Sequence, residues 1–310
     1  LCAAFLQSLT VFLITLPVIS YWFFSLPPYG ILLNLLVIPM TGALLLLGFV
    51  LLAAAFTVPP LALLCGQILH LALGMQILLC RLAEHLPFHR ILLGRPKAWQ
   101  LVAYSLCLSL SFRLLLGRSA QEKEKRFSKK RCVLFVCAVF GAVLSLLPIR
   151  SRVPRVWVLD IGQGDALVIE QGSRCITIDG GSTSRPDCGK QVIEPFLMSR
   201  ALGTVDAAFL THADLDHTNG LSYLASRGSG IRVKRVILNP AAETDAHYAK
   251  LMAALRENPE TELFFMGAGD VYGNFHCLWP PREALPEEVN EQSLILLFTA
   301  NGKRCLFTGD

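Results

Sequence analysis

The sequence predicts two parts of different kinds, a multi-helix transmembrane bundle followed by an α/β domain. Of its 310 residues, 53% are hydrophobic and 16% are charged, whereas about a quarter of the residues of an ordinary soluble protein carry charge. This apolar content excludes a disordered or collagen-like chain. The first 80 residues contain no Asp, Glu, Lys or Arg. The net charge is +10 over 1–150 and −5 over 151–310, which places a domain boundary near residue 150.

Five apolar runs in the first part are long enough to span a bilayer. About 18 or more apolar residues can cross, because a helix satisfies every backbone amide internally. The runs cover 1–24, 31–56, 61–80, 98–116 and 132–149. Their number and length exclude a signal peptide, and the charge-free start argues against buried helices of a soluble protein.

Polar residues inside these runs predict more than an anchor. Pro39 follows Asn34 in the second run, which indicates a broken helix that lines a cavity. Gln67 and His70 are three residues apart and share a helix face. Such groups either hold helices together or line a water-filled path, and the sequence leaves both interpretations open.

Basic residues between the fourth and fifth runs predict the orientation. Eight Lys or Arg lie within 113–131, and loops of this kind stay in the cytoplasm. Residues 151–310 would then lie on the extracytoplasmic side of a multi-pass cell-membrane protein. The loop 81–97, on the same outer side, carries four basic residues and is amphipathic enough to lie on lipid headgroups. Nucleic-acid binding by the basic loop is the alternative, but topology explains its charges more simply.

The second part alternates short strands, turns and helices, which indicates an α/β or α+β layered domain. Strands are expected at 156–160, 166–169, 174–179, 206–210, 232–238, 261–265, 293–299 and 304–307. Helices are expected at 191–202, 221–226 and 243–257. Asn301-Gly302, between the last two strands, is a strong signal for a two-residue hairpin.

The chemistry is expected at 211–220, between a buried strand and a helix. Residues at i, i+2 and i+4 of an extended stretch point the same way, so we expect His212, Asp214 and Asp216 to share one side. His217 joins them where the helix begins. Two imidazoles and two carboxylates packed this closely need a cation, and mixed nitrogen and oxygen ligands suit Zn²⁺ or Mn²⁺. A solvated loop with an Asp helix cap is the alternative, but four candidate ligands within six positions favour the metal site.

These residues resemble a known signature. The segment is similar to the His-x-His-x-Asp-His motif of the metallo-β-lactamase fold, with Asp214 in place of the second His. Asp179, before Gly180-Gly181, resembles the Asp that ends an early strand of that fold. Asp310 resembles a later Asp, after a Gly, whose carboxylate bridges two metals. The resemblance implies an αββα sandwich for 151–310, truncated at its C-terminal end.

The resemblance extends to the ComEC type of competence protein, over nearly all 310 residues. In that family the lactamase-like domain follows a bundle of membrane helices. It opens with a phrase like 159–165, which ends in Asp165 here. The phrase 290–293, beginning with Asn290, is also similar to that family.

The resemblance implies a divalent metal cofactor, Zn or Mn, with two ions in a complete site. His212 and Asp214 would hold one ion. Asp216 and His217 would hold the other, and Asp310 would bridge the two. Asp179, Asn290 and Asp165 would support them.

This sequence departs from the family pattern in two places. Asn290 stands near the position where the fold usually offers another His, and an amide is a weaker ligand. A final His normally follows the Gly-Asp motif, beyond residue 310. Because residue 1 is Leu and residue 310 closes a strand-turn phrase, we expect a fragment truncated at both ends, without a complete two-metal site.

The family resemblance implies a role in DNA uptake. ComEC proteins form the channel that brings single-stranded DNA across the cytoplasmic membrane during transformation, and their lactamase-like domain is proposed to be a nuclease. Expected partners are incoming single-stranded DNA, membrane lipid and other DNA-uptake proteins. In metal-assisted hydrolysis a water loses its proton near neutral pH, and Asp216 would orient it as the catalytic residue.

Two alternatives stay open: a membrane-anchored metallohydrolase of another substrate, and a non-catalytic DNA-binding domain that kept the lactamase fold. The acidic balance of 151–310 does not favour DNA binding by charge, so the DNA substrate rests on the resemblance. Four cysteines lie in this part, at Cys175, Cys188, Cys277 and Cys305. The absence of a Cys-x-x-Cys pair argues against a thiolate zinc site, and the sequence leaves disulfide pairing open.

Overall fold

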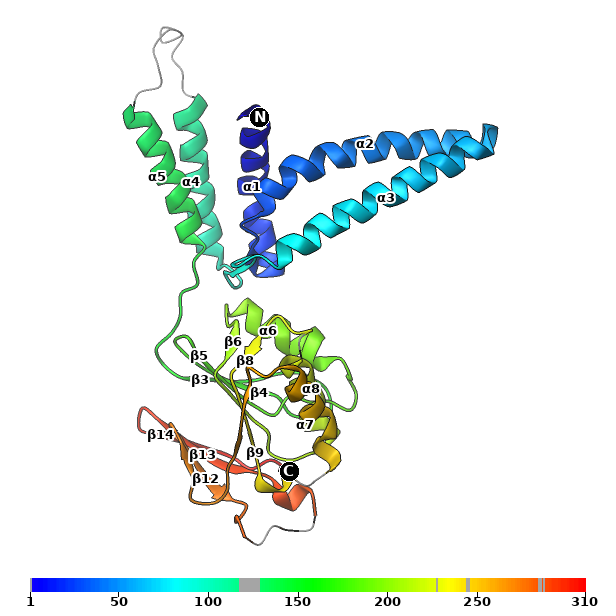
Figure 1. Cartoon of the computed structure of the whole chain (residues 1–310). Coiled ribbons are helices and arrows are strands. Elements are labelled where there is room, and N and C mark those ends of the chain that lie inside the picture. Colours follow the sequence, from blue (N-terminus) through cyan, green and yellow to red (C-terminus); the bar gives the residue numbers. More distant parts are fainter. Residues whose placement is uncertain (1, 117–128, 227, 244–245, 284–285, 287) are drawn as a thin grey trace. The chain divides into compact units, whose positions relative to one another are not determined.

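The computed structural model describes residues 2–116, 129–226, 228–243, 246–283, 286 and 288–310. They form two compact units, Leu1–Leu147 and Pro148–Asp310, which are described separately (Figure 1). The residues 117–128, which contain much of the basic segment used to predict orientation, lie outside the described part.

The first unit is helical over each of the five apolar runs. Its helices are α1 Cys2–Phe23, α2 Gly30–Thr57, α3 Pro59–Glu84, α4 Ala98–Leu116 and α5 Lys129–Ser145. A short strand β1, Ser25–Leu26, pairs antiparallel with β2, Ile91–Leu92. Among the described residues, three helices are long and apolar enough to cross a membrane, Phe5–Phe23, Gly30–Thr57 and Pro59–Glu84. Val133–Ser145 of α5 is a shorter apolar helix, so the crossing of all five runs stays a prediction.

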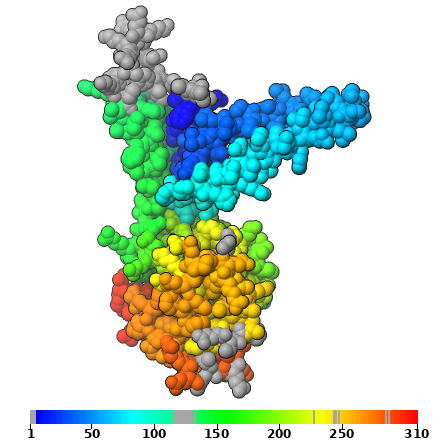
Figure 2. Space-filling view, viewed as in Figure 1, coloured from blue at the N-terminus to red at the C-terminus, as the bar shows by residue number. Residues whose placement is uncertain are grey.

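The helices α2 and α3 lie side by side along their length (Figure 2) and expose large apolar side chains. Phe49 is 69% exposed and Leu71 is 74% exposed, which is costly in water and favourable in lipid. Pro39 lies inside α2, which continues unbroken from Gly30 to Thr57, so the expected helix break is wrong. Pro39 removes one backbone hydrogen bond of the helix. In a bilayer the neighbouring amides have no water to bind, so they keep their helical hydrogen bonds and the helix continues.

The second unit contains a six-stranded mixed sheet in the order β10-β9-β7-β5-β4-β3. Its strands are β3 Arg155–Val158, β4 Leu167–Gln171, β5 Arg174–Ile178, β7 Ala207–Phe209, β9 Arg235–Leu238 and β10 Glu262–Phe265. The first three are antiparallel neighbours, and β5, β7, β9 and β10 run parallel. Two short strands, β6 Thr204–Val205 and β8 Arg232–Val233, form a separate parallel pair. The parallel strands therefore bring all their carboxyl ends to one edge of the sheet.

A second, antiparallel sheet has the order β11-β12-β13-β14. Its strands are β11 Val271–Tyr272, β12 Phe275–Trp279, β13 Ile295–Ala300 and β14 Lys303–Phe307. The predicted hairpin is confirmed: Ala300 pairs with Lys303, and Asn301 and Gly302 have φ of 50° and 73°, as a type I′ turn requires.

Two hydrophobic clusters join the layers. The first packs α7, Leu215–Ala225, and α8, Ala249–Glu257, against one face of the larger sheet. The second fills the space between the sheets, where the Phe209 and Phe275 ring centroids are 4.8 Å apart. The described layers are helix, sheet and sheet, and the mixed sheets agree with the predicted lactamase-type sandwich.

Several predicted boundaries move. The helix expected at 221–226 begins at Leu215. The helix expected at 243–257 is divided into 3₁₀ turns at Pro240–Glu243 and Ala246–Tyr248 followed by α8. The helix expected at 191–202 is a π-helical turn, Gly189–Ile193, followed by α6, Glu194–Ser199. The cysteines at 175, 188, 277 and 305 are free thiols, and the first three are buried like apolar side chains.

Candidate metal centre

The candidate metal centre lies at the carboxyl edge of the larger sheet, where β5, β7 and β9 end. Asp179 follows β5 directly, His212 follows β7 by three residues, and Asn239 follows β9 directly. Residues after the carboxyl ends of parallel strands converge on one place, which is why binding sites in mixed α/β sheets form there.

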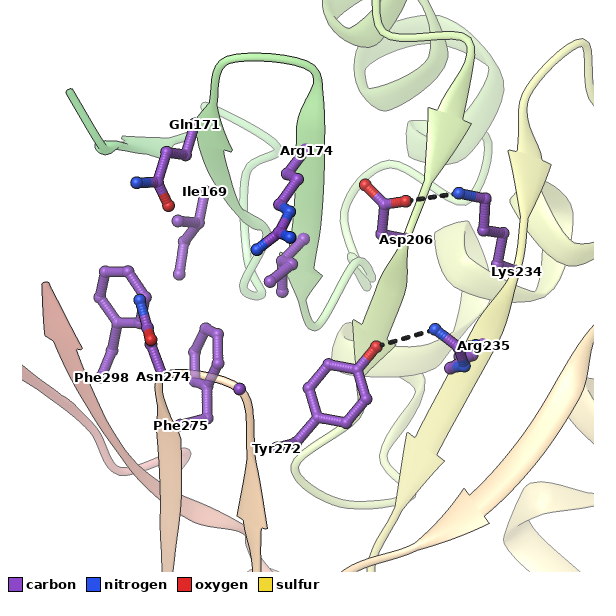
Figure 3. A pocket seen from close by; sticks show the side chains of 12 residues that line it. Ile169, Gln171, Arg174, Asp206, Lys234, Arg235, Tyr272, Asn274, Phe275 and Phe298 are labelled. Carbon is purple, nitrogen blue, oxygen red and sulfur yellow. Dashed lines mark hydrogen bonds and ion pairs between the residues drawn. The ribbon is translucent and has the colours of Figure 1, made fainter. Parts of the chain in front are cut away.

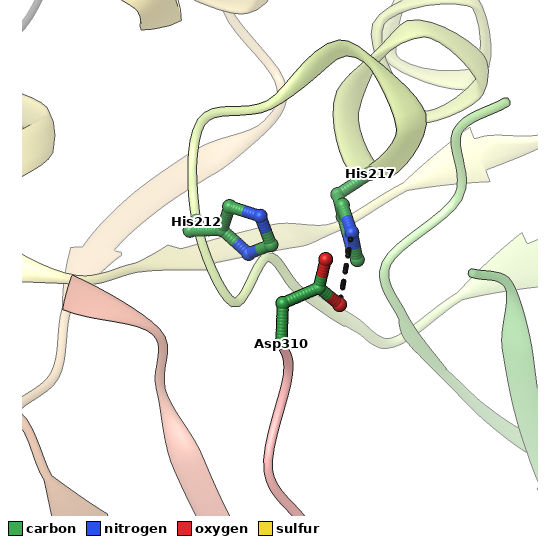
Figure 4. Close-up of side chains that lie close together, drawn as sticks. All are labelled: His212, His217 and Asp310. Carbon is green, nitrogen blue, oxygen red and sulfur yellow. Dashed lines mark ion pairs between the residues drawn. The ribbon is translucent and has the colours of Figure 1, made fainter. Parts of the chain in front are cut away.

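Three side chains converge at this edge: His212, His217 and Asp310 (Figure 4). Each offers one ligand atom, and these atoms lie within 4.8 Å of one another. The two imidazole ring centroids are 4.1 Å apart, and His217 Nε2 is 3.5 Å from Asp310 Oδ1. His212 follows β7 of the larger sheet, His217 lies on α7, and Asp310 follows β14 of the second sheet.

Glycine makes this approach possible. Gly309 has φ of 66°, and a Cβ there would lie 2.8 Å from the Ser293 side chain. The Gly-Asp pair therefore turns the chain sharply after β14, Lys303–Phe307, and presents Asp310 to the imidazoles.

A short relay fixes the orientation of His212. The Thr211 hydroxyl is 2.9 Å from Asp179 Oδ2 and 3.0 Å from His212 Nδ1. A carboxylate only accepts, so the single hydroxyl proton goes to Asp179 and the hydroxyl oxygen accepts the proton of His212 Nδ1–H. The Nε2 atom is then left with its lone pair. It is buried and has no hydrogen-bond partner among the described residues. A neutral imidazole whose other nitrogen is held by a hydrogen bond is a typical metal ligand.

Asp179 also orients His217. Its Oδ2 atom is 3.1 Å from His217 Nδ1, so Nε2 of that ring faces Asp310. Both partners are almost fully buried. Asp179 accepts the Thr211 backbone N–H as well, at 2.8 Å. Its carboxylate therefore contacts both Thr211 and the ring of His217, and its role in supporting metal ligands stays a prediction.

Electrostatics separate the two imidazoles. Burial lowers the pKa of His212, and the neighbouring His217 lowers it further. Burial also lowers the pKa of His217, but its contact with Asp179, with added effects of Asp310 and Asp216, outweighs this and raises the pKa to about 9. At neutral pH without a cation, His212 is neutral and His217 carries the single positive charge of the pair.

The loop 161–165 brings Asp165 to the same edge. Gly164 has φ of 136°, and a Cβ there would overlap the backbone carbonyl oxygens of Gly181 and Asp216. Asp165 N–H donates to the Asp216 carbonyl oxygen at 3.2 Å. Burial raises the pKa of Asp165, His217 opposes this, and the surrounding carboxylates raise it further. The carboxylates at this edge therefore carry more negative charge than the single imidazolium of His217 can neutralise.

The motif residues divide into two groups. Asp214 lies in the N-cap position of α7 but makes no side-chain capping hydrogen bond. Its Oδ2 atom is instead 3.6 Å from His212 Nε2, which disfavours the helix-cap interpretation. Asp216 lies in the first turn of α7, so the expected extended alternation ends at Asp214, because the helix begins at Leu215. Asp216 contributes its charge to Asp165 and His217 but is not among the three converging ligands.

Asn290 lies in an exposed 3₁₀ turn, Asn290–Gln292, and the structure does not bring its side chain to the three ligands. Ser293, from the same phrase, does reach the site: its hydroxyl is 3.2 Å from His212 Nδ1. Asn239 holds this phrase in place, because its buried amide donates to the backbone carbonyls of Thr211 and Gln292 at 3.3 and 2.8 Å. Thr211 and Ser293 lie inside the segments 211–220 and 290–293 but were not expected to act at the site. Asn239 lies in no motif, and only its position directly after a strand could have indicated it.

The donor set fits a divalent cation. A buried, unpartnered imidazole nitrogen, a second imidazole nitrogen and a carboxylate oxygen point at one place, with two further acids beside them. Nitrogen and oxygen ligands in this mixture are typical of Zn²⁺ and Mn²⁺.

Comparison with known proteins agrees with this geometry. A family model described as Competence protein matches residues 2–118, and the Metallo-beta-lactamase superfamily model matches residues 159–310. ComE operon protein 3 of Bacillus subtilis (strain 168) is 28% identical over 193 residues, which is 56% of this chain and 24% of that protein. Together these matches support a ComEC-type competence protein. The chain spans about a quarter of the length of this ComEC relative.

Solved structures with a lactamase fold also align with the ComEC-type chain. The metallo-beta-lactamase fold protein YhfI from Bacillus subtilis has a TM-score of 0.34 and 13% identity, covering 53% of this chain and 60% of that one. A metallo-β-lactamase-like protein from Thermotoga maritima has a TM-score of 0.35 and 16% identity, covering 50% of this chain and 77% of that one. The fold assignment rests on the family match and the sheet topology, and the lactamase fold implies divalent metal binding.

Proposed function

We propose that this chain acts in DNA uptake across the cytoplasmic membrane, and that its lactamase-fold domain is a divalent-metal-dependent phosphodiesterase that cuts incoming DNA. One observation carries the proposal. His212 Nε2 is buried beside His217 and Asp310 with no hydrogen-bond partner in the part of the chain that the structure describes. The membrane part of the same chain matches the competence family.

We assign two cations, Zn²⁺ or Mn²⁺, to the complete site. His212 and Asp214 would hold the first, and their 3.6 Å separation supports a shared ion. Asp216 and His217 would hold the second. Asp310, 3.5 Å from His217 Nε2, would bridge the two.

The cations would lower the pKa of a bound water and neutralise charge that develops on the phosphoryl oxygens. The protein residues would do the positioning. Asp179 and Thr211 hold the imidazole rings with their Nε2 lone pairs turned inward. Asp216, at the first turn of α7, would orient the attacking water. Asp165, whose backbone N–H donates to the Asp216 carbonyl oxygen, would place its side chain at the rim of the same site.

The proposed side of the membrane is the outer one. The basic residues of 113–131 would hold that segment in the cytoplasm, so α5 would carry the following domain outward. Single-stranded DNA, membrane lipid and other DNA-uptake proteins would be the partners there.

The direct test is metal content and nuclease activity of the full chain in detergent. After chelation and reloading with Zn²⁺ or Mn²⁺, we expect bound metal by elemental analysis and cleavage of end-labelled single-stranded DNA. The variant His212→Ala should lose both, whereas Arg256→Gln, an exposed change on α8, should lose neither. Failure to retain any metal at millimolar free Zn²⁺ or Mn²⁺ would contradict the proposal.

The exposed position of Asn290 favours a second candidate, a DNA-binding domain that kept the fold without catalysis. The two differ in what Asp214→Ala does in cells that depend on this protein for transformation. Catalysis predicts loss of nuclease activity together with lower transformation frequency. Binding alone predicts unchanged transformation and no nuclease activity in the parent protein.

A further inference from the structure

A second pocket lies at the opposite edge of the same sheet, where the parallel strands begin. It occupies about 480 Å³, within the range of small-molecule sites. Arg174 is the first residue of β5, Asp206 directly precedes β7, and Arg235 is the first residue of β9. The metal centre follows the other ends of these strands, so the length of β5, ~16 Å, separates the two places.

The floor of the pocket is aromatic and aliphatic. Phe275 and Phe298 line it with Ile169 and Ile176 (Figure 3), and the two phenyl ring centroids are 4.7 Å apart. These side chains belong to the core between the sheets, so the floor is rigid. Phe275 and Phe298 are only 1% and 6% exposed, so this floor offers a flat ring apolar contact at the base of the pocket rather than two open ring faces.

The rim is polar and positively charged. Lys234 Nζ is 2.7 Å from Asp206 Oδ1, and Arg235 Nε is 2.8 Å from Glu262 Oε2, so both cations are already neutralised. Arg174 is exposed, and no carboxylate of the described residues pairs with it. Its side chain lies between Gln171 and Asp206 in Figure 3. One free guanidinium at the mouth of an apolar pocket suits one phosphate group, because guanidinium binds phosphate bidentately.

Two amides complete the rim. The side chains of Gln171 and Asn274 line the pocket and make no hydrogen bond to any described residue. An amide offers both donors and an acceptor, so the pair can contact the edge of a heterocyclic ring lying on the phenyl groups.

We infer that this pocket binds one nucleotide unit, with its base on Phe275 and Phe298, its base edge at Gln171 and Asn274, and its phosphate on Arg174. An acyl chain would leave the guanidinium and amides unused. A long run of phosphates would need more than one free cation. The inference stands on this pocket alone and does not require the metal centre, although a nucleoside monophosphate is also a product class of the proposed hydrolysis.

The test is calorimetric titration of the full chain in detergent, with EDTA present so that the metal centre takes no part. Deoxyadenosine monophosphate should bind, and Arg174→Gln should weaken it at least tenfold. Asn274→Ala should weaken it about threefold. Arg256→Gln, which removes an exposed arginine from α8, should leave it unchanged. Deoxyadenosine without phosphate should bind weakly in the parent protein and equally in Arg174→Gln.

A second series separates a free nucleotide from a nucleotide within a strand. If the pentamer of deoxyadenylate binds in an Arg174-dependent way and the monophosphate does not, the natural occupant is a unit of single-stranded DNA. No Arg174-dependent binding of either ligand overturns the inference. His212→Ala should not change these affinities, and Arg174→Gln should not change metal content, so failure here is distinct from failure of the metal centre.

Discussion

The two edges of the larger sheet place opposite chemistry on the same strands. At the carboxyl edge, ligand atoms of His212, His217 and Asp310 converge, and the buried His212 Nε2 has no hydrogen-bond partner among the described residues. At the amino edge, Arg174 lines a pocket together with Phe275 and Phe298, and no carboxylate among the described residues pairs with it. The first arrangement is built for a cation and the second for an anion with a flat ring. The length of one strand separates the acidic cluster from Arg174, so their charges do not neutralise each other.

The largest effect is expected when one carboxylate is removed at each edge, Asp179 at the carboxyl edge and Asp206 at the amino edge. Asp179→Ala would take the buried carboxylate away from His217 Nδ1, so the free energy of unfolding should fall by about 3–5 kcal/mol. Metal affinity should fall about 10- to 100-fold, because the rings lose their orienting group. Thermal unfolding and chelator competition measure the two quantities.

Asp206→Ala is the control at the other edge. Asp206 accepts the Cys175 N–H at 3.0 Å and pairs with Lys234, but it is partly exposed. Its removal should cost about 1 kcal/mol and leave metal affinity within about twofold. Equal effects of the two changes on metal binding would break the comparison.

The two edges should also differ in their response to pH. His217 has a pKa raised to about 9, and a proton competes with a metal for its Nε2. Zinc affinity should therefore fall about tenfold for each pH unit below 9. Chelator competition between about pH 7 and 8.5 measures this slope. In the metal-free protein the sign is opposite. The stabilising imidazolium–Asp179 contact is complete below about pH 6.5 and is lost as pH rises through about 9.

Deoxyadenosine monophosphate binding should stay nearly constant over the same interval. Arginine remains protonated, and the second phosphate pKa is about 6. A parallel pH slope for both ligands would show that one site serves both.

A pair of threonines gives a smaller and sharper test. Thr211→Val removes the hydroxyl that links Asp179 to His212, so metal affinity should fall about tenfold. Thr177, on β5, is also buried, but its Oγ1 has no hydrogen-bond partner among the described residues. Thr177→Val should leave metal affinity unchanged and stability equal or slightly higher. Unchanged metal affinity in Thr211→Val would show that the Asp179–Thr211–His212 relay does not orient His212.

The smallest effect is expected at the hairpin that carries both Phe298 and Asp310. Gly302 has φ of 73° and no neighbouring atom within 4 Å of an added Cβ. Gly302→Ala should cost about 1 kcal/mol of unfolding free energy through backbone strain alone. Both ligand affinities should stay within about twofold, measured as above.

Local signals predicted much of this molecule. The charge-free start indicated the membrane helices, Asn301-Gly302 indicated the hairpin, and the 211–220 segment indicated two of the three converging ligands. Those features depend on neighbours in sequence. The start of α7 at Leu215 did not follow, because residues 215–219 lack apolar periodicity and tertiary contacts hold them in a helix.

Features made by distant segments were out of reach. Ser293 meets His212 across 81 residues, and Asn239 meets Gln292 across 53. Asn290 was expected at the site, yet only its neighbour three residues later arrives there. The amino-edge pocket draws on both sheets, and no single stretch of sequence carries its pattern.

The place of Asp310 has a mechanical consequence. It follows the last strand of the second sheet, whereas His212 follows β7 of the first sheet and His217 lies on the next helix, α7, nearly a hundred residues earlier. An ion held by all three would cross-link the two layers and close a very long loop, a constraint whose entropic worth grows with loop length. A chelator would then remove this cross-link as well as the activity. The contact between the two sheets should become less stable, and the domain should become more susceptible to proteolysis.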